Sequence, residues 1–534
     1  MTPPNWSSNL SHPNPGPNSL VLRQQAELHA SRKEWDLAIH CFKAILSQRP
    51  GNADVLLQLS YVESLAGHYR NAREYALQAQ RARPSDPNVI QELIARLRTF
   101  NEPKAVKACI EQLRPWNQVP IPLLIACAGQ LSNLGDQTGA LGLLEEAKRG
   151  DADYPPTLLA RGQVLTYLGR FDEAEQNLLH CLRRAPEIAN TYWWLSRLRN
   201  QAPGSNHVDL IQSQLNRPGR KPEEIALLSY ALHKELDDLG DFAGAWRALT
   251  QACRAKRSRL EYRAEDTRTL VSKLMELPTR PPLVAGAQSA SGRVPIFIVG
   301  MHRSGTTLLE HLLDRHDDVL GVGELYDFTC QMRHATDHHC RGVIDATLVS
   351  RAGEVDYAAV GAGYLEGMEW RLGQEHFFTD KLPSNFLNIG FICQALPQAK
   401  ILHMVRDPVE TCFSNLRELF SDACPYSYDQ AELADYYLQY ERLMQHWHRS
   451  YPGRILDVDY AALTRSPEEV LPEVAAFCGM EFHPKMLETS PRSRGIATAS
   501  AVQVRARVQA RDFPKWAPYA ELLQSLRQLV ESTR

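Results

Sequence analysis

Small residues recur along the first half of the chain at a spacing that predicts paired helices. The alanines concerned are separated by multiples of 34 residues: Ala38, Ala72, Ala140 and Ala174. Glycines lie five positions before three of them and prolines twelve positions after three of them: Gly67, Gly135, Gly169, Pro50, Pro84 and Pro186. Glycine permits the turn between two helices, alanine allows their close approach, and proline ends the second helix. The pattern therefore predicts an all-α region of stacked helical hairpins.

This pattern resembles the tetratricopeptide repeat over about residues 23–186. The repeat at 102–115 departs from it, because Asn101 and Val106 stand in the glycine and alanine places. Weaker hairpins follow, and we expect the solenoid to cover residues 21–277. Such arrays commonly hold a peptide or a partner protein on their curved surface, although the pattern itself names no partner.

Two stretches without helical periodicity flank the repeats. Residues 1–20 are rich in Pro, Asn and Ser and do not have the basic and apolar segments of a signal peptide, so we expect a disordered leader. Residues 278–293 are rich in Pro, Gly and Ser and are predicted to form a linker. A second domain is then expected to occupy residues 294–534.

Composition fits a multidomain protein and excludes some classes of partner. The chain has 534 residues and a net charge of −3, which gives no overall attraction to nucleic acid or to an acidic membrane. Its 11 cysteines form no C-x-x-C pair, which favours reduced thiols in a cytoplasmic protein. No apolar stretch approaches the length of about 18 residues that a membrane-spanning helix needs. Any anion site must therefore be local.

A candidate anion-binding loop opens the second domain. An apolar run leads into a loop bounded by Gly300 and Gly305, and an amphipathic run follows, which is the order of a strand, a turn and a helix. Thr306 and Thr307 fall at the helix start, where backbone N–H groups and the helix dipole attract anions. A Walker loop would have lysine after its last glycine, whereas this chain has Thr306 there and a cation earlier, at Arg303.

A second strand-to-helix junction is predicted around Arg406. Asp407 is placed as a helix cap and Pro408 at the first helical position. Ser414 lies eight residues after Arg406, so that two helical turns return its hydroxyl to the end of the strand. Arginine at that end can bind a phosphate through two parallel hydrogen bonds. We therefore expect a P-loop-like α/β domain with a central parallel sheet.

The segment Arg303-Ser304-Gly305-Thr306-Thr307 resembles the 5′-phosphosulfate loop of sulfotransferases, above all that of tyrosylprotein sulfotransferases and their bacterial relatives. The resemblance implies 3′-phosphoadenosine 5′-phosphosulfate as co-substrate, without a metal. It places the 3′-phosphate at Arg406 and Ser414. Further residues that it places at the nucleotide are Tyr460, beside the adenine, and Ser500, Arg505 and Arg507 in the C-terminal segment.

The same resemblance implies three catalytic residues. Lys381 corresponds to the lysine that contacts the bridging oxygen between sulfate and nucleotide, and Arg303 shares the stabilisation of charge. Glu324 corresponds to the glutamate that deprotonates the acceptor, although a surface glutamate in a turn is the alternative. The tyrosylprotein enzymes carry another arginine twelve residues after the first, where this chain has Glu418, with Arg417 one position away. The second cation at the 3′-phosphate is therefore left open.

The function predicted from these residues is transfer of a sulfuryl group to a hydroxyl acceptor. The resemblance suggests a tyrosine, while carbohydrate, lipid or small phenol acceptors fit equally well. Two alternatives stay open: a P-loop kinase of a small substrate, which the missing lysine opposes, and a non-enzymatic repeat scaffold with a relic nucleotide domain. A His/Cys cluster at 334–340 is predicted to be a solvated loop on the acceptor side, because nothing supplies a second ligand pair for zinc.

Overall fold

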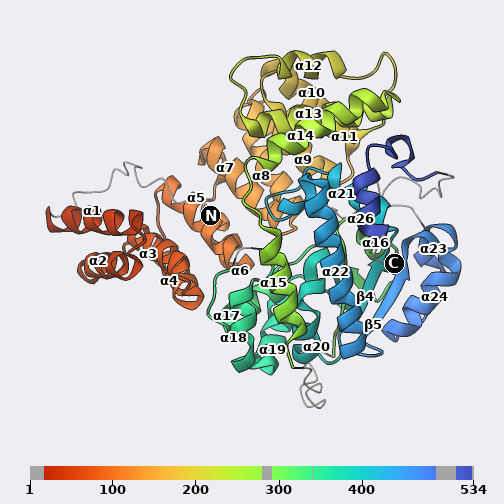
Figure 1. The fold of residues 1–534 in the computed structure, drawn as a ribbon. Helices are drawn as coiled ribbons and strands as arrows, with labels where there is room; N and C mark the ends of the chain where they lie inside the picture. Colours follow the sequence, from red (N-terminus) through yellow and green to blue (C-terminus); the bar gives the residue numbers. More distant parts are fainter. Residues whose placement is uncertain (1–16, 279–291, 341, 489–512, 532–534) are drawn as a thin grey trace.

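The computed structural model describes residues 17–278, 292–340, 342–488 and 513–531. Its first part consists of helices and their connecting turns, drawn from red to green in Figure 1. We call this part the repeat region. Its α-helices are α1 (Pro17–Ser31), α2 (Trp35–Gln48), α3 (Ala53–Ala66), α4 (Tyr69–Arg81), α5 (Pro87–Thr99), α6 (Pro103–Glu111), α7 (Ile121–Asn133), α8 (Gln137–Gly150), α9 (Pro155–Tyr167), α10 (Phe171–Arg184), α11 (Ala189–Leu198), α12 (Val208–Leu215), α13 (Pro222–Asp238), α14 (Phe242–Arg257) and α15 (Ala264–Met275).

The hairpins follow the predicted pattern of glycine and alanine. Gly67 ends α3 with a φ of +91°, a left-handed backbone that favours glycine. Ala72 and the other three repeat alanines are fully buried, which lets the paired helices approach closely. In the divergent repeat, Asn101 makes the turn instead, with a φ of +57°, and Val106 is fully buried. The predicted all-α architecture of stacked helical hairpins is confirmed.

Helix α15 attaches the repeat region to the rest of the chain. It packs against α22 (Gln430–Ser450) and α18 (Ala346–Arg351), which lie in the C-terminal part. Arg268 of α15 forms an ion pair with Asp435 of α22 at 2.9 Å. The preceding helix contributes Arg257, whose guanidinium lies 2.8 Å from Glu432 of α22.

The C-terminal part contains a parallel sheet, which within the described residues has five strands. Their order across the sheet is β2 (Val319–Gly321), β3 (Phe377–Asp380), β1 (Val294–Gly300), β4 (Lys400–Val405) and β5 (Ile455–Asp459). In the centre of the sheet, Ile298 of β1 is paired with Leu402 of β4. The predicted α/β domain with a central parallel sheet is confirmed, and the molecule joins two architectures.

Helices cover both faces of this sheet, as a parallel sheet requires. Successive residues of β1 point to opposite faces: Ile296 packs with α16 (Thr306–Leu313) and α24 (Pro467–Cys478), and Phe297 packs in the other core. The remaining α-helices described in this part are α17 (Asp327–Ala335), α19 (Tyr357–Met368), α20 (Ile389–Ala395), α21 (Pro408–Leu416), α23 (Tyr460–Arg465) and α26 (Gln524–Glu531). The sheet is thus the middle layer of three.

The predicted leader and the predicted linker can each be compared with the structure in part. Helix α1 already begins at Pro17, inside the stretch predicted as a disordered leader. Residues 1–16 of that leader and 279–291 of the predicted linker lie outside the described residues. Among the helices of the described ranges, none has both the length and the apolar character needed to cross a membrane.

Candidate active site

The predicted site residues follow the ends of the strands. Arg303 lies in the loop after β1, Lys381 follows β3, Arg406 follows β4, and Tyr460 comes directly after β5. Because the strands of the sheet all run parallel, these positions share its carboxyl edge. Ligands of open α/β sheets bind at this edge. The fold therefore gathers side chains that are far apart in the sequence.

The loop between β1 and α16 has an unusual backbone. Gly300, Arg303 and Gly305 have φ values of +150°, +70° and +109°. A Cβ atom added at Gly305 would lie 2.4 Å from the Tyr460 ring, so the close approach of this ring requires glycine. Arg303 adopts a left-handed conformation that is uncommon for a residue with a side chain and that tends to occur at functional sites.

The first turn of α16 offers hydrogen-bond donors. Gly305 is its N-cap residue, and the side chains of Thr306 and Thr307 lie buried in that turn. The Ser304 hydroxyl is buried and has no hydrogen-bond partner among the described residues. A buried polar atom without a partner is costly, which makes it a natural contact for a bound ligand. The turn therefore fits an anionic group.

Arg406 and Ser414 lie against the same loop. Arg406 donates from Nη1 to the carbonyl oxygen of Arg303 at 2.9 Å and from Nη2 to Glu410 at 2.7 Å. Its guanidinium carbon lies 4.4 Å from the centroid of the Tyr460 ring. Nε of Arg303 donates to Oγ of Ser414 at 3.2 Å. The structure thus brings together four of the residues predicted to bind the nucleotide.

Lys381 and Glu324 form an ion pair. The Lys381 ammonium is fully buried and lies 2.7 Å from Oε1 of Glu324, whose side chain is 38% exposed. The backbone N–H of Lys381 donates to the carbonyl oxygen of Gly323 at 3.0 Å, which fixes the turn containing Glu324 beside the end of β3. The predicted base is therefore accessible and oriented by a buried cation.

Glu418 and Arg417 lie where the sequence left the second cation at the 3′-phosphate open, and both form ion pairs. Glu418 Oε1 lies 3.0 Å from Nη1 of Arg197, which comes from α11 of the repeat region, and its Oε2 lies 3.7 Å from Nη1 of Arg303. Arg417 instead contacts Asp237 of α13, with Nη2 2.5 Å from the carboxylate. Both residues are thus engaged with the repeat region.

Three further predicted nucleotide contacts fall within residues 489–512, which lie outside the described residues: Ser500, Arg505 and Arg507.

Comparison with known proteins bears on this geometry. Residues 295–484 match the sequence model described as the sulfotransferase family, and residues 155–188 match that of the tetratricopeptide repeat. The chain carries a sulfotransferase-family domain. The match covers the sheet and most of the residues at its carboxyl edge, and the predicted combination of tetratricopeptide repeats with this domain is confirmed.

The chain is also similar to individual proteins. An uncharacterized protein of Aquifex aeolicus is 26% identical over 413 residues, which is 73% of this chain and 52% of that protein, so the chain spans about half the length of this relative. A Caenorhabditis briggsae protein with the provisional name protein-tyrosine sulfotransferase is 28% identical over 192 residues, 36% of this chain and 68% of that protein. The solved sulfotransferase domain of the Synechococcus PCC 7002 olefin synthase is 20% identical, covers 45% of this chain and 94% of its own, and has a TM-score of 0.29.

A cavity of about 450 Å³ lies between the sulfotransferase domain and the repeat region. Glu324 and His302 of the domain line it together with Tyr167, Trp194 and Arg197 of α9 and α11. Sequence reasoning did not find the three repeat residues, because repeat aromatics normally fill the core between helices. The partial exposure of Trp194 in a buried helix is the feature that distinguishes it.

His302 is the residue of the phosphosulfate-type loop that reaches this cavity. Its Nδ1 lies 3.1 Å from the Tyr426 hydroxyl, and its carbonyl oxygen accepts from Nδ2 of Asn415 at 2.6 Å. Burial, the largest cause, lowers the pKa of His302 to about 4. The imidazole is therefore neutral near pH 7, beside the carboxylate of Glu324.

The His/Cys cluster is exposed, as the sequence predicts, only at His334. The His339 ring lies 5.6 Å from the Tyr69 ring and 6.0 Å from the Phe100 ring, both in the repeat region. Cys340 is buried, and the half-buried His338 is hydrogen-bonded to Asp345 at 2.8 Å. The prediction of a solvated loop is wrong for this part of the cluster because helices of the repeat region pack against it, a contact that local sequence cannot reveal.

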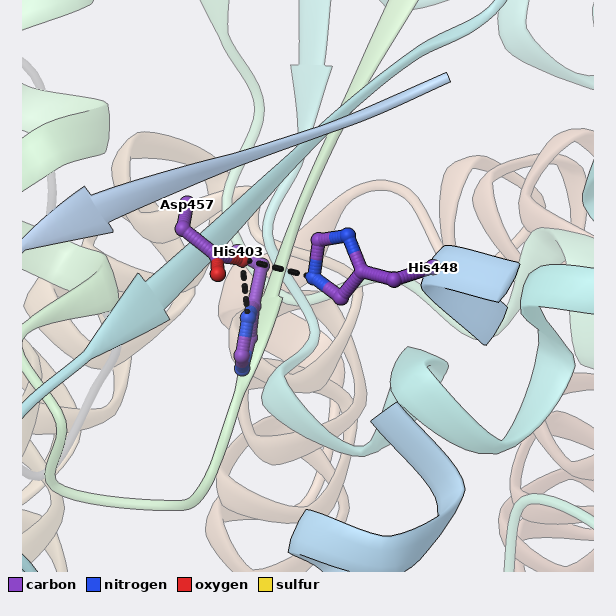
Figure 2. Close-up of side chains that lie close together, drawn as sticks. All are labelled: His403, His448 and Asp457. Carbon is purple, nitrogen blue, oxygen red and sulfur yellow. Dashed lines mark hydrogen bonds and ion pairs between the residues drawn. The ribbon is translucent and has the colours of Figure 1, made fainter. Parts of the chain in front are cut away.

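One trio of side chains in the domain has the composition of a metal site. His403 of β4, His448 of α22 and Asp457 of β5 converge in Figure 2, and their facing atoms lie within 4.8 Å of one another. Oδ1 of Asp457 lies 2.7 Å from Nδ1 of His403 and 2.9 Å from Nε2 of His448, and Tyr440 contacts the other nitrogen of His403. These hydrogen bonds explain why the three side chains converge, because they connect β4 and β5 to α22.

Proposed function

We propose that the protein transfers a sulfuryl group from 3′-phosphoadenosine 5′-phosphosulfate to a hydroxyl acceptor. The observation that carries this proposal is the pair of Lys381 and Glu324, a buried ammonium 2.7 Å from an accessible carboxylate. Glu324 and His302 of the phosphosulfate-type loop line one cavity. The pair therefore lies where a donor held by the loop and an acceptor in the cavity would meet.

The residues at the carboxyl edge of the sheet fit an adenosine nucleotide with phosphate groups at the 5′ and 3′ positions of its ribose. Arg303, the start of α16 and the Ser304 hydroxyl, for which the described residues provide no partner, would hold the 5′-phosphosulfate. Arg406 and Ser414, which both contact Arg303 of the same loop, would hold the 3′-phosphate. Tyr460 would lie beside the adenine.

In the proposed reaction, Glu324 accepts the proton of the acceptor hydroxyl while that oxygen attacks sulfur. One S–O bond forms to the acceptor, and the S–O bond to the 5′-phosphate breaks, which gives a sulfate ester and adenosine 3′,5′-bisphosphate. Lys381 and Arg303 neutralise the charge that develops on the leaving phosphate oxygen. Ion pairing with Lys381 also holds Glu324 as an oriented carboxylate before the transfer.

A hydroxyl on a peptide is the acceptor class that suits this combination of domains. Tetratricopeptide arrays commonly hold peptides, and the name of the Caenorhabditis briggsae relative refers to protein tyrosine. A tyrosine side chain on a peptide is therefore the first acceptor to test.

Two variants test the proposal. Arg406→Ala should weaken the binding of adenosine 3′,5′-bisphosphate, measured by calorimetry, by roughly ten- to a hundredfold, because hydrogen bonds to a charged group contribute about 1.5–3 kcal/mol. Glu324→Gln should bind the bisphosphate like the parent protein but transfer label from the sulfate donor about 10²- to 10⁴-fold more slowly.

Arg465→Ala, which changes an exposed arginine of α23, is the matched control and should leave both measurements unchanged. A parent protein that binds no bisphosphate would refute the donor assignment. Unaltered turnover in Glu324→Gln would refute the assignment of the base.

A further inference from the structure

The cavity beside Glu324 has one wall from the repeat region. Tyr167 at the end of α9 and Trp194 in α11 line it, and their rings meet edge to face with centroids 5.5 Å apart. Arg197, one helical turn after Trp193, lies with its guanidinium carbon 4.7 Å from the Trp193 ring centroid. These side chains form a rigid aromatic surface that belongs to the repeats.

The rest of the lining is also aromatic. Tyr426 and Tyr436 of the sulfotransferase domain are stacked with ring centroids 3.5 Å apart, and the ring of Tyr262, from the turn between α14 and α15 of the repeat region, lies 6.2 Å from that of Tyr426. Tyr326, 43% exposed, and Phe420 complete the lining on the side of the sulfotransferase domain. A molecule in the cavity would therefore meet aromatic rings from both the repeat region and the sulfotransferase domain.

Several polar groups of the lining are already paired with one another. The Tyr262 hydroxyl lies 3.1 Å from that of Thr267, and Arg197 is paired with Glu418 at 3.0 Å. The Tyr426 hydroxyl is hydrogen-bonded to His302. Because these groups are paired with one another, fewer polar groups are left to bind a ligand, which favours a ligand that binds through contacts with the aromatic rings.

We propose that α9 and α11 of the repeat region complete the acceptor site and that the cavity selects an acceptor whose hydroxyl is carried on an aromatic ring. The proposal rests on the proposed function and adds the part that the repeat helices play in the acceptor site and the physical source of the selection for an aromatic acceptor. The ring of a phenol would lie between Trp194 and the tyrosine pair, with its hydroxyl at Glu324. Edge-to-face and offset contacts with aromatic walls add about 0.5–1.5 kcal/mol each beyond the burial of area.

The cavity volume agrees with this class of acceptor. Ligand sites typically enclose about 300–1,000 Å³, so 450 Å³ can take a phenol ring together with the chain that carries it. Free phenols and tyrosine side chains share this chemistry. They differ in the groups attached to the ring, and a comparison of both is part of the test.

The test measures acceptor binding without the reaction. With the donor site saturated by adenosine 3′,5′-bisphosphate, calorimetry compares 4-methylphenol with 4-methylcyclohexanol, which has nearly the same size and no aromatic ring. We expect the phenol to bind at least fivefold more tightly. Trp194→Leu and Tyr167→Leu keep an apolar side chain and should each weaken phenol binding by roughly two- to tenfold, with bisphosphate affinity unchanged.

Trp116→Leu is the matched control, because Trp116 is a half-buried tryptophan of the repeat region that does not line the cavity. It should bind the phenol like the parent protein. N-acetyltyrosine amide and a tyrosine-containing peptide, measured in the same way, separate the two sources: tighter binding of the peptide assigns a protein acceptor, and equal binding assigns a free phenol.

The experiment tests aromatic selection and the role of the repeat helices separately. Equal binding of 4-methylphenol and 4-methylcyclohexanol would refute aromatic selection, and unchanged phenol binding in both leucine variants would refute the part of the repeats. Either result leaves the proposed function intact if the bisphosphate still binds. Should one variant fail to fold in a thermal unfolding control, the other carries the test.

Discussion

At the scale of single residues, Gly305 joins the fold to the proposed donor site. It caps α16 with a φ of +109°, and the Tyr460 ring lies where a side chain at 305 would begin. The same ring is covered by the guanidinium of Arg406. A side chain at 305 would therefore disturb the loop backbone and the Arg406 contact together.

Gly305→Ala should destabilise the protein by about 1–3 kcal/mol, because the left-handed backbone is strained for alanine, and should also weaken adenosine 3′,5′-bisphosphate binding. Thermal unfolding and calorimetry measure the two effects. Gly479→Ala separates them, because Gly479 has a φ of +82° with open space around its Cβ position and lies at the end of α24. This control should lose stability and keep its nucleotide affinity.

At the scale of elements, the segment after α21 connects the phosphosulfate-type loop to the repeat region. Glu418 bridges Arg303 of the loop and Arg197 of α11, and Arg417 binds Asp237 of α13. The Arg417 side chain also donates to His233 at 3.0 Å. A helix end in the sulfotransferase domain is thus held by two repeat helices.

Arg417→Met decides whether this arginine serves structure or nucleotide binding. We expect a stability loss of about 1–3 kcal/mol, because Asp237 is left half-buried without its cation, and no change in bisphosphate affinity. Chemical denaturation and calorimetry supply the two values. A fall in affinity like that expected for Arg406→Ala would instead make Arg417 the second cation at the 3′-phosphate.

At the scale of the whole molecule, one buried and two half-buried histidines make the contact between the two regions sensitive to acid. Burial is the largest cause that lowers the pKa of His233 and of His339 to about 3 and that of His302 to about 4. His233 contacts Arg417 across the boundary, His339 packs on the first repeats, and His302 lies at the cavity.

Stability should therefore fall as the pH is lowered from about 6.5 to 4. In this window the unfolded chain binds protons on these histidines, whose ordinary pKa is about 6.5, while the folded protein does not. Thermal unfolding at pH 7 and pH 5 should show the loss. His339→Gln should reduce the difference between the two pH values, and His40→Gln, which changes an exposed histidine of α2, should not. Equal pH dependence in both variants would contradict the role given to burial.

The sequence by itself determined the local chemistry. The period of 34 residues predicted the helical hairpins because glycine, alanine and proline act on the backbone where they stand. Two strand-to-helix junctions predicted two anion sites in an α/β domain, and the structure places Arg303, Arg406 and Ser414 of these junctions in contact with one another. Such patterns are readable because each depends on residues close in the chain.

Only the tertiary structure decided what the two regions do together. The packing of the repeats on the sulfotransferase domain covers part of His339, engages Arg417 and brings Trp194 and Glu324 into the lining of one cavity. These contacts join residues more than a hundred positions apart, and their identity depends on the curvature of the solenoid and on its docking angle. Neither quantity is encoded in a local pattern, so the acceptor cavity became visible only in the folded chain.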